Sequence, residues 1–516
     1  MKSLANSAPR RVSRVPNFES GVLAEPLLSF GGGHKHVDPK TGLALYGPYG
    51  LQGQPRPPLR SIIVGIIGPP NAIADAEAWL KACGGTLTND GTQPFLYPHF
   101  PGFNDSAPFG CDLLFGDTWR ETIKATAIAS ALGIADFKKR IGAVVTLYTD
   151  AIGILADRDP KPHVILCCIP KEIIASCTVR RPADARQPKL RRRPRGSLSD
   201  HQLQLFSFPS EEEDEAANQN LRRALKAAAM RHAIPTQLVW PQSLALTSAT
   251  QGAERVQDIA TRAWNFTTAL YHKAGGSPWR LAEADPGVCF VGISFYKELT
   301  ANTPAMRTSM AQAFTAAGDG YVLRGNTFEW NDAKERSPHL TKSVAAGLLR
   351  DVIERYKKQN HNSLPTRIVV HKSSRYWEEE LAGFEEACSV VPNKDFIALG
   401  SRGVQFYRAG DYPPLRGTYV KFSDGDLLLY TSGYVPFLRT YPGARVPQPL
   451  EILEHHGDSP WDIVLKEVLA LTKMNWNSAD FSGGQPITIA FARRVGQILA
   501  EVSPDARIQP EYRFYM

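Results

Sequence analysis

Residues 264–280 read WNFTTALYHKAGGSPWR, and an apolar run, Val288–Ile293 (VCFVGI), follows them and ends at Ser294. Asn265 and Lys273 are eight residues apart, so a helix places them two turns apart on one face. The apolar run is typical of a buried strand. A strand that ends in serine lacks the carboxylate with which a protein binds a divalent ion.

This stretch resembles the end of an Argonaute MID domain leading into the first strand of a PIWI domain. The asparagine, the lysine, the pair Gly275–Gly276 and the apolar strand all fall in the family's register. The PIWI fold is similar to ribonuclease H, whose chemistry needs carboxylate or imidazole ligands that hold two metal ions about 4 Å apart. The resemblance implies that Ser294 replaces the first of these ligands.

Composition is that of a folded protein with a basic surface. The chain has 516 residues, 43% of them apolar and 21% charged, which favours about three domains. No apolar run is long enough to cross a membrane and the N-terminus has no secretory signal, so we expect a cytoplasmic protein.

The net charge of +8 suits a polyanionic partner. Seven cysteines form no CxxC pair, and we expect them in the core, reduced.

The pattern along the chain predicts an α/β fold. Residues 60–70 read as a buried strand ending in a Gly-Pro turn, and Ala72–Cys83 reads as the helix that follows. Neither GxGxxG nor GxxxxGK[ST] is present, which argues against a nucleotide-binding loop. A second buried strand at 163–170 continues the pattern of a doubly wound, mostly parallel sheet. We expect a Rossmann-like MID domain followed by a ribonuclease H-like PIWI domain.

We expect four regions: a flexible leader at 1–24, a segment at 25–59 packing on PIWI, a MID domain at 60–283 and a PIWI domain at 284–516. A basic and then an acidic run lie in an insertion at about 178–216, which is either a solvated loop or a docking element. Only about sixty residues precede the MID-like strand, too few for a PAZ domain. The stretch beginning FGGGHKH at Phe30 resembles the opening of short prokaryotic Argonautes, and this resemblance implies the short MID-PIWI class.

The resemblance implies a pocket for the 5′ phosphate of a guide strand. Arg222 and Lys226 are four apart, so a helix presents both on one face toward a single anion. The family pattern adds Gln237 on the next strand and Lys273 on the following helix. It also implies help from Asn265 and from the terminal carboxylate of Met516, which would hold Mg²⁺ against the phosphate. The alternative is that Arg222 and Lys226 belong to the solvated face of an amphipathic helix.

The catalytic positions of a cleaving PIWI domain read here as Ser294, Ser373 and Phe491. The glutamate position cannot be fixed, and Asp319 or Glu329 could fill it by chance. One carboxylate cannot assemble a two-metal site, so we expect no catalytic residues and no cleavage by this chain.

Basic and polar residues next to aromatic ones are candidates for contacts along a nucleic-acid backbone, although the same pattern occurs in surface loops. The candidates are Arg439, Arg445, Lys473 and Asn475.

The resemblance therefore implies a guide-loaded sensor in a prokaryotic defence system. Guide RNA and single-stranded target DNA would be its nucleic-acid partners. An effector protein with an APAZ region would be its heterodimeric partner and deplete NAD, with a sirtuin-like effector favoured and a TIR effector next. Two other readings stay open: a guided endonuclease whose metal ligands are unrecognised, and a small-molecule α/β enzyme.

Overall fold

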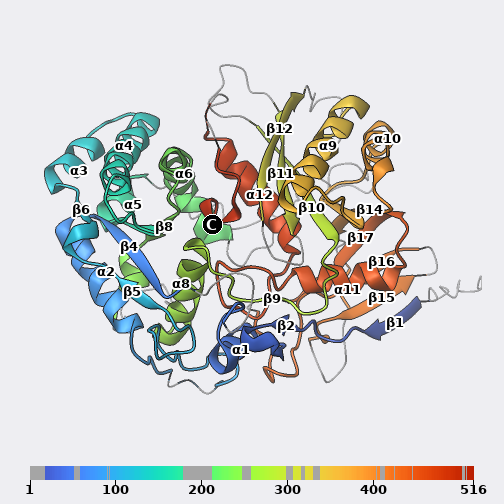
Figure 1. Cartoon of the computed structure of the whole chain (residues 1–516), viewed down its shortest axis with the longest axis horizontal. Helices are drawn as coiled ribbons and strands as arrows, with labels where there is room; N and C mark the ends of the chain where they lie inside the picture. The colour runs from blue at the N-terminus through green and yellow to red at the C-terminus, as the bar shows by residue number, and fades with distance from the viewer. Residues whose placement is uncertain are drawn as a thin grey trace, which may run out of the picture.

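The computed structural model describes residues 18–51, 59–89, 91, 93–177, 212–246, 257–297, 306–314, 320–328, 338–401, 404–406, 413–422, 425–443, 446–502, 506 and 508–516. They form two lobes joined by the stretch 274–287 and by an N-terminal segment, residues 18–51 (Figure 1). We call residues 59–273 the first lobe and residues 288–516 the second lobe. No helix of the described chain is long and apolar enough to cross a membrane.

The first lobe contains a parallel sheet, as the apolar runs predict. Its strands lie in the order β5 (Asp112–Leu114), β4 (Ser61–Gly68), β7 (Val164–Cys168) and β8 (Thr236–Val239), and β6 (Arg120–Thr122) also pairs with β4. The strand and helix predicted at 60–83 are confirmed as β4 and α2. The helices are α2 (Pro70–Cys83), α3 (Ala125–Leu132), α4 (Phe137–Ala156), α5 (Lys171–Cys177), α6 (Glu212–Ala229), α7 (Pro241–Leu244) and α8 (Ile259–Lys273).

The second lobe is built on a mixed nine-stranded sheet, in the order β1-β15-β16-β17-β14-β13-β10-β11-β12. Strands β10, β13 and β14 run parallel, and the other neighbours are antiparallel. The strands are β1 (Phe18–Val22), β10 (Val288–Lys297), β11 (Met306–Phe314), β12 (Val322–Phe328), β13 (Arg367–Lys372), β14 (Asn393–Ser401), β15 (Thr418–Phe422), β16 (Leu427–Leu429) and β17 (Leu450–Gly457). The helices are α9 (Lys342–Gln359), α10 (Glu378–Ala387), α11 (Trp461–Leu471) and α12 (Ile487–Leu499).

Strand β10 is buried on both faces, which explains its unbroken apolar run. Cys289, Val291 and Ile293 pack in a cluster with α9 and α10, whereas Phe290 belongs to the cluster that includes α11 and α12. At Gly292 the backbone of α12 comes so close that a β-carbon would collide with the carbonyl oxygen of Thr488. The glycine therefore sets how closely α12 approaches the sheet.

The N-terminal segment differs from the expectation. Residues 18–22, predicted to lie in a flexible leader, form β1 and pair in register with β15. The segment continues through β2 (Leu28–Ser29), β3 (Lys35–His36) and α1 (Pro39–Tyr46), and β2 pairs with β9 (Arg280–Leu281) in the stretch between the lobes. Its contacts therefore reach both lobes and the connection between them.

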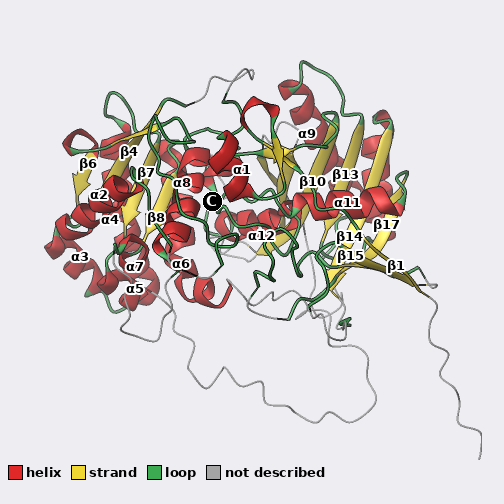
Figure 2. Ribbon diagram, turned by 90° about the horizontal axis from the view of Figure 1, so that it is seen from below, coloured by secondary structure: helices red, strands yellow, loops and turns green. Residues whose placement is uncertain are grey.

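The insertion predicted at about 178–216 falls largely outside the described residues, and α6 begins within its acidic run, at Glu212. All seven cysteines are buried and unpaired, which confirms the prediction that they belong to the core. Figure 1 and Figure 2 both place α8 and α12 between the two sheets, and Figure 1 marks the C-terminus beside them. The region between the sheets is therefore lined by both lobes and by the end of the chain.

Candidate nucleic-acid interface

Lys273, the last residue of α8, lies at the centre of the candidate site. Its side chain is 0% exposed, and its Nζ donates a hydrogen bond to Oε1 of Gln237 on β8. The sequence predicts both residues for one phosphate pocket, and the structure brings them into direct contact.

Lys226 reaches the neighbouring residue of the same strand. Its Nζ donates to the carbonyl oxygen of Thr236 at 3.0 Å, and the residue is 2% exposed. Lys226 is therefore not on the solvated face of α6, which removes the alternative reading for this residue. Within the described part of the chain, neither Lys226 nor Lys273 forms an ion pair with a carboxylate. Two ammonium groups thus converge on residues 236–237 with neutral oxygens as their recorded partners.

The surrounding charges are positive as well. Burial lowers the pKa of Lys226 to about 7, with a further lowering from Arg222 and Arg494. Burial also brings the pKa of Lys273 well below its ordinary value, and Lys226, Arg222 and Arg494 add to the effect. A bound anion would oppose both causes, because a nearby negative charge favours the ammonium form. We call Arg222, Lys226, Lys273 and Arg494 the cationic cluster.

Arg494 is the member of the cluster that the sequence did not indicate. It lies on α12 of the second lobe, and α12 packs against α6 of the first lobe. No local spacing relates Arg494 to Arg222 or Lys226, and only the packing of the two lobes brings them together. The candidate site is therefore shared between the lobes.

The end of the chain closes the same region. Met516 is buried, and the Tyr515 hydroxyl donates to the carbonyl oxygen of Gln509 at 2.8 Å. The ring of Tyr512 lies 5.7 Å from that of His272, the neighbour of Lys273 on α8. The structure thus agrees with a terminus that is tucked in, as expected for Met516.

Asn265 has a different recorded partner. Its Oδ1 accepts a hydrogen bond from the backbone N–H of Ala479 at 2.9 Å, so it ties α8 to the second lobe. Eight residues of helix separate it from Lys273, which corresponds to a rise of about 12 Å. The contact assigns Asn265 to the interface between lobes and not to the cationic cluster.

The positions where a nuclease would hold metal ions are adjacent in space. Strands β10 and β13 pair through Gly292 with His371 and through Ile293 with Lys372. Ser294 and Ser373 each come next, so the two serines stand side by side where the parallel pairing of β10 and β13 ends. Ser373 follows the last residue of β13, whereas β10 does not end at Ser294, as the apolar run suggested, but continues to Lys297 in its pairing with β11. Among the described residues, no group of three or more His, Cys, Asp or Glu side chains is arranged to hold a metal ion.

Phe491, at the fourth degenerate position, is part of the core. Its ring meets that of Tyr512 edge-on, with 3.9 Å between centroids, and so packs α12 against the C-terminal residues. His371 is buried in the same lobe, where its Nδ1 lies 2.8 Å from the Thr488 hydroxyl and burial lowers its pKa to about 3. His371 is therefore neutral and joins β13 to α12. Asp319 and Glu329 lie outside the described residues.

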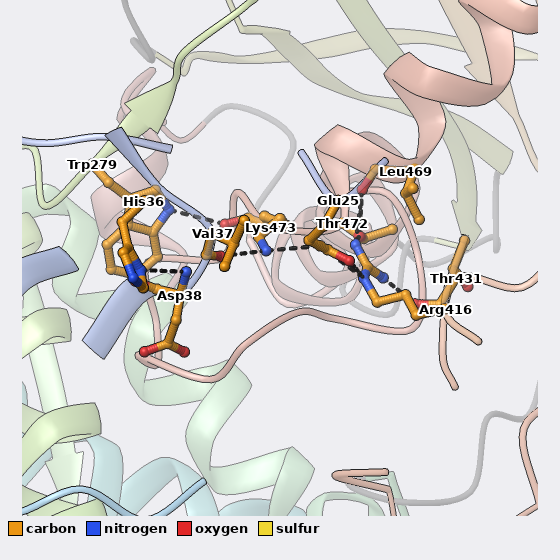
Figure 3. Close-up of polar contacts among 10 residues, drawn as sticks. All are labelled: Glu25, His36, Val37, Asp38, Trp279, Arg416, Thr431, Leu469, Thr472 and Lys473. Atoms are coloured by element: carbon orange, nitrogen blue, oxygen red, sulfur yellow. Dashed lines mark hydrogen bonds and ion pairs between the residues drawn. The ribbon is translucent and has the colours of Figure 1, made fainter. Parts of the chain in front are cut away.

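Lys473, predicted to contact a nucleic-acid backbone, is instead buried (1% exposed). Its Nζ donates to Oε1 of Glu25 at 2.8 Å and to the carbonyl oxygen of Val37 at 2.6 Å (Figure 3). Glu25 also accepts from Nε of Arg416 at 3.0 Å, so one carboxylate serves two buried cations. The prediction for Lys473 was wrong because its counter-ion comes from the other end of the chain.

The other three candidates for contacts with a nucleic-acid backbone are Asn475, Arg439 and Arg445. Asn475 is half-buried, and its Oδ1 accepts from the backbone N–H of Asn477 at 3.1 Å. Arg439 is exposed, with its guanidinium 4.9 Å from the ring centroid of Phe95. Arg445 lies outside the described residues. Of these candidates, Arg439 is the one that the structure places on the surface.

Comparisons with known proteins agree with this architecture. No protein-family model matches the chain. An argonaute protein of Aquifex aeolicus (strain VF5) is 23% identical over 219 residues, which is 42% of this chain and 28% of that protein. The structure of Clostridium butyricum Argonaute bound to a guide DNA and a 19-mer target DNA superposes with a TM-score of 0.60 at 14% identity, over 96% of this chain and 54% of that one.

Two further solved structures superpose on this chain over a similar extent. Drosophila Piwi has a TM-score of 0.55 at 14% identity, over 96% of this chain and 56% of that one. A. aeolicus Argonaute has a TM-score of 0.55 at 15% identity, over 95% and 54%. The chain therefore has an Argonaute-like α/β fold with a mixed sheet. It spans about half the length of these solved chains, and its match to the curated relative covers 28% of that protein.

Proposed function

We propose that this chain binds a guide strand by its 5′ phosphate and pairs that strand with a complementary target without cutting it. The observation that carries the proposal is the pair of buried ammonium groups, Lys226 and Lys273, which converge on β8 with no carboxylate partner among the described residues. Burial and mutual repulsion disfavour the charged form of both lysines, and an anion that enters the site would offset that penalty. A terminal phosphate brings about two negative charges and several acceptor oxygens.

The Argonaute-like fold supports the nucleic-acid part of this proposal. The Clostridium butyricum relative was solved with guide and target DNA, and this chain shares its fold over nearly all of its own length. For this chain we propose an RNA guide and a single-stranded DNA target, in a cytoplasmic protein of the short MID-PIWI type. The proposal of RNA comes from the resemblance of the sequence and is tested by identifying the nucleic acid that co-purifies.

The absence of cutting is supported by Ser294 and Ser373. Both are uncharged residues that directly follow the last paired positions of β10 and β13, where we expect a two-metal nuclease to carry carboxylates. Incubation of loaded protein with a labelled complementary strand and Mg²⁺ or Mn²⁺ tests this. We expect an intact target that stays bound to the loaded protein. A single cut opposite the middle of the guide would show a guided endonuclease with other ligands.

Mg²⁺ is part of the proposal as a structural ion on the guide phosphate. The terminal carboxylate of Met516 would be its protein ligand, since Mg²⁺ is commonly held by one or two carboxylates together with phosphate oxygens and water. The buried position of Met516 fits this role, whereas the cationic cluster opposes a further positive charge. Retention of a 5′-phosphorylated strand in the presence of EDTA tests this role of Mg²⁺. Loss of retention would support the bound ion, whereas unchanged retention would show that the cationic cluster holds the phosphate without it.

We further propose that target binding activates an effector protein with an APAZ region, which depletes NAD in cells carrying phage or plasmid DNA. The support is the resemblance of the sequence to short prokaryotic Argonautes, with a sirtuin-like effector favoured and a TIR effector next. Such activation requires that target bind the active state of the complex more tightly than the inactive state. Measuring NAD after adding target to the purified complex tests this step, and unchanged NAD would contradict it.

A further inference from the structure

An aromatic and cationic surface lies where the two lobes and the N-terminal segment meet. Phe95 comes from a turn of the first lobe, Phe437 and Arg439 come from a loop of the second lobe, and His36 comes from β3. The Phe95 and Phe437 ring centroids are 5.9 Å apart, and those of Phe437 and His36 are 5.0 Å apart, both edge-on. The Arg439 guanidinium lies 4.9 Å from the Phe95 centroid. We call these four residues the stacking platform.

The platform is open to solvent at the Phe95 and Arg439 end. Phe95 is 39% exposed and Arg439 is exposed, while Phe437 and His36 are half-buried. An arginine stacked on an exposed ring forms a flat cationic surface, which a planar ligand with negative charge can extend. The position of this pair therefore suggests a ligand with a flat face.

Both exposed members are held in place by backbone contacts. Arg439 has φ +54°, a left-handed conformation that is uncommon for a residue with a side chain. Its N–H donates to the carbonyl oxygen of Pro436 at 3.1 Å, and the loop is closed by the bond from Val435 N–H to the Thr440 carbonyl oxygen at 3.0 Å. These two hydrogen bonds hold the turn, and with it the backbone of Arg439, in one conformation.

The Phe95 turn and the His36 strand are fixed in the same way. The Tyr97 N–H donates to the Gln93 carbonyl oxygen at 2.9 Å, and the Lys40 ammonium donates to the carbonyl oxygen of Leu96 at 3.3 Å. Beside His36, the Val37 carbonyl oxygen accepts from the buried Lys473 (Figure 3). The platform is therefore preorganised, so that a ligand need not order it on binding.

We propose that the platform stacks an unpaired base of the bound guide strand, downstream of its 5′ phosphate. This inference rests on the proposed function. An aromatic ring with a neighbouring arginine suits every nucleobase, because each base has a π-face and the arginine adds attraction for the phosphate backbone. The acid nearest in sequence to His36, Asp38, is buried and caps α1 through the Thr41 N–H at 2.7 Å, so it does not repel a polyanion at the surface. The guide is the strand whose bases are unpaired before a target arrives.

Two oligonucleotides separate the platform from the phosphate pocket. A 5′-phosphorylated dinucleotide probes the cationic cluster, and a 5′-phosphorylated 19-mer, the target length in the Clostridium butyricum complex, can also reach the platform. For Phe95→Ala and Arg439→Ala we expect the 19-mer affinity to fall by about tenfold. The dinucleotide affinity should stay as in the wild type. Phe95→Trp should keep the 19-mer affinity, and its added tryptophan emission should be quenched by the 19-mer.

Controls make the outcome specific. Trp377, at the start of α10, is as exposed (40%) as Phe95 and stacks on His339, so Trp377→Ala removes an aromatic surface elsewhere and should leave both affinities unchanged. With a preformed guide–target duplex, Phe95→Ala should also have no effect, because the bases are already stacked.

Unchanged 19-mer affinity in both platform variants would overturn the inference, as would an equal loss for single strand and duplex. It would likewise be overturned if the variants lost a protein partner while binding the 19-mer normally. Failure of the wild type to bind either oligonucleotide would instead contradict the proposed function, on which the platform depends.

Discussion

Lys273 donates its ammonium hydrogen bond to the side-chain oxygen of Gln237, 36 residues earlier in the chain. Lys273 ends α8, the last helix of the first lobe, and Gln237 is the second residue of β8, so the contact fixes the position of the lysine relative to the parallel sheet. Burial and the neighbouring cations lower the pKa of Lys273 well below its ordinary value, and an anionic ligand would favour its charged form again. This pair defines the candidate site.

The pH dependence of loading should reflect Lys226, whose pKa is lowered to about 7 from an ordinary 10.5. A phosphate stabilises the ammonium form, so above pH 7 loading must take up a proton at Lys226, and this residue alone should lower the affinity by at most about tenfold per pH unit. Binding titrations at about pH 7 and about pH 9 in buffers of different ionisation enthalpy measure this uptake. Lys226→Met should bind more weakly and take up fewer protons than the wild type, and Lys273, whose pKa is also lowered, accounts for the remaining uptake. A pH-independent affinity in the wild type would contradict the assignment.

The same lowered pKa affects the stability of the unloaded protein. Between pH 7 and 10.5 the unfolded chain keeps a proton on Lys226 that the folded chain has lost, so this group makes the protein more stable as pH rises through that window. Below pH 7 both states are protonated and the full penalty of burying the charge applies. Binding of a 5′-phosphorylated strand should remove this increase in stability with pH.

Arg494→Ala should weaken retention of a phosphorylated strand by several-fold to about tenfold, although the residue is on the second lobe. Arg494 acts on Lys226 and Lys273 through its charge, so removing it should also raise the pKa of both lysines. Binding affinity and proton uptake are the readouts. Lys466→Ala is a suitable control, because this exposed lysine pairs with Asp462 on α11. Equal affinities for Arg494→Ala and wild type would remove Arg494 from the site.

The sequence could predict that Lys226, Gln237 and Lys273 lie close together, because Arg222 and Lys226 are one helical turn apart and because the resemblance places Gln237 and Lys273 in the same pocket. That the pocket binds phosphate stays a prediction. Arg494 could not be predicted, since its role depends on how α12 packs against α6. Lys473 was assigned to the surface because its partner Glu25 is 448 residues away in the sequence. Residues 18–22 were missed as a strand for the same reason, since β15 lies far along the chain.

Ser294→Asp should not create a nuclease. Ser373 stands beside it at the end of β13, and Phe491 is packed against Tyr512, so a single new carboxylate has no second ligand at these positions. We expect no product from a labelled target with Mg²⁺ or Mn²⁺, for this variant or for Ser294→Asp with Ser373→Asp. Guided cleavage by the single variant would show that other residues of the chain supply the remaining metal ligands. It would contradict the assignment of Ser373 and Phe491 as positions that prevent cleavage.

Glu25→Gln should destabilise the protein without touching the cationic cluster. Glu25 is the carboxylate shared by Arg416 and Lys473, and breaking a buried ion pair by removing one partner costs roughly 3–5 kcal/mol. Burial alone raises the pKa of Glu25, but Arg416 and Lys473 outweigh it and the net pKa is lowered. Its stabilisation is thus present above pH 4.5 and is lost as pH falls through the lower folded-state value. Denaturant unfolding near neutral pH and in acid measures both effects, and an unchanged midpoint would contradict the role of Glu25.

The ratio of affinities for 5′-phosphorylated and 5′-hydroxyl versions of one oligonucleotide tests the central claim most directly. Each charge-assisted contact to phosphate contributes roughly 1.5–3 kcal/mol, so the wild type should prefer the phosphorylated strand by at least about tenfold to a hundredfold. The double variant Gln237→Ala with Lys273→Ala should lose that preference while retaining its fold. Equal affinity of the wild type for both strands, or a preference that survives in the double variant, would contradict the account.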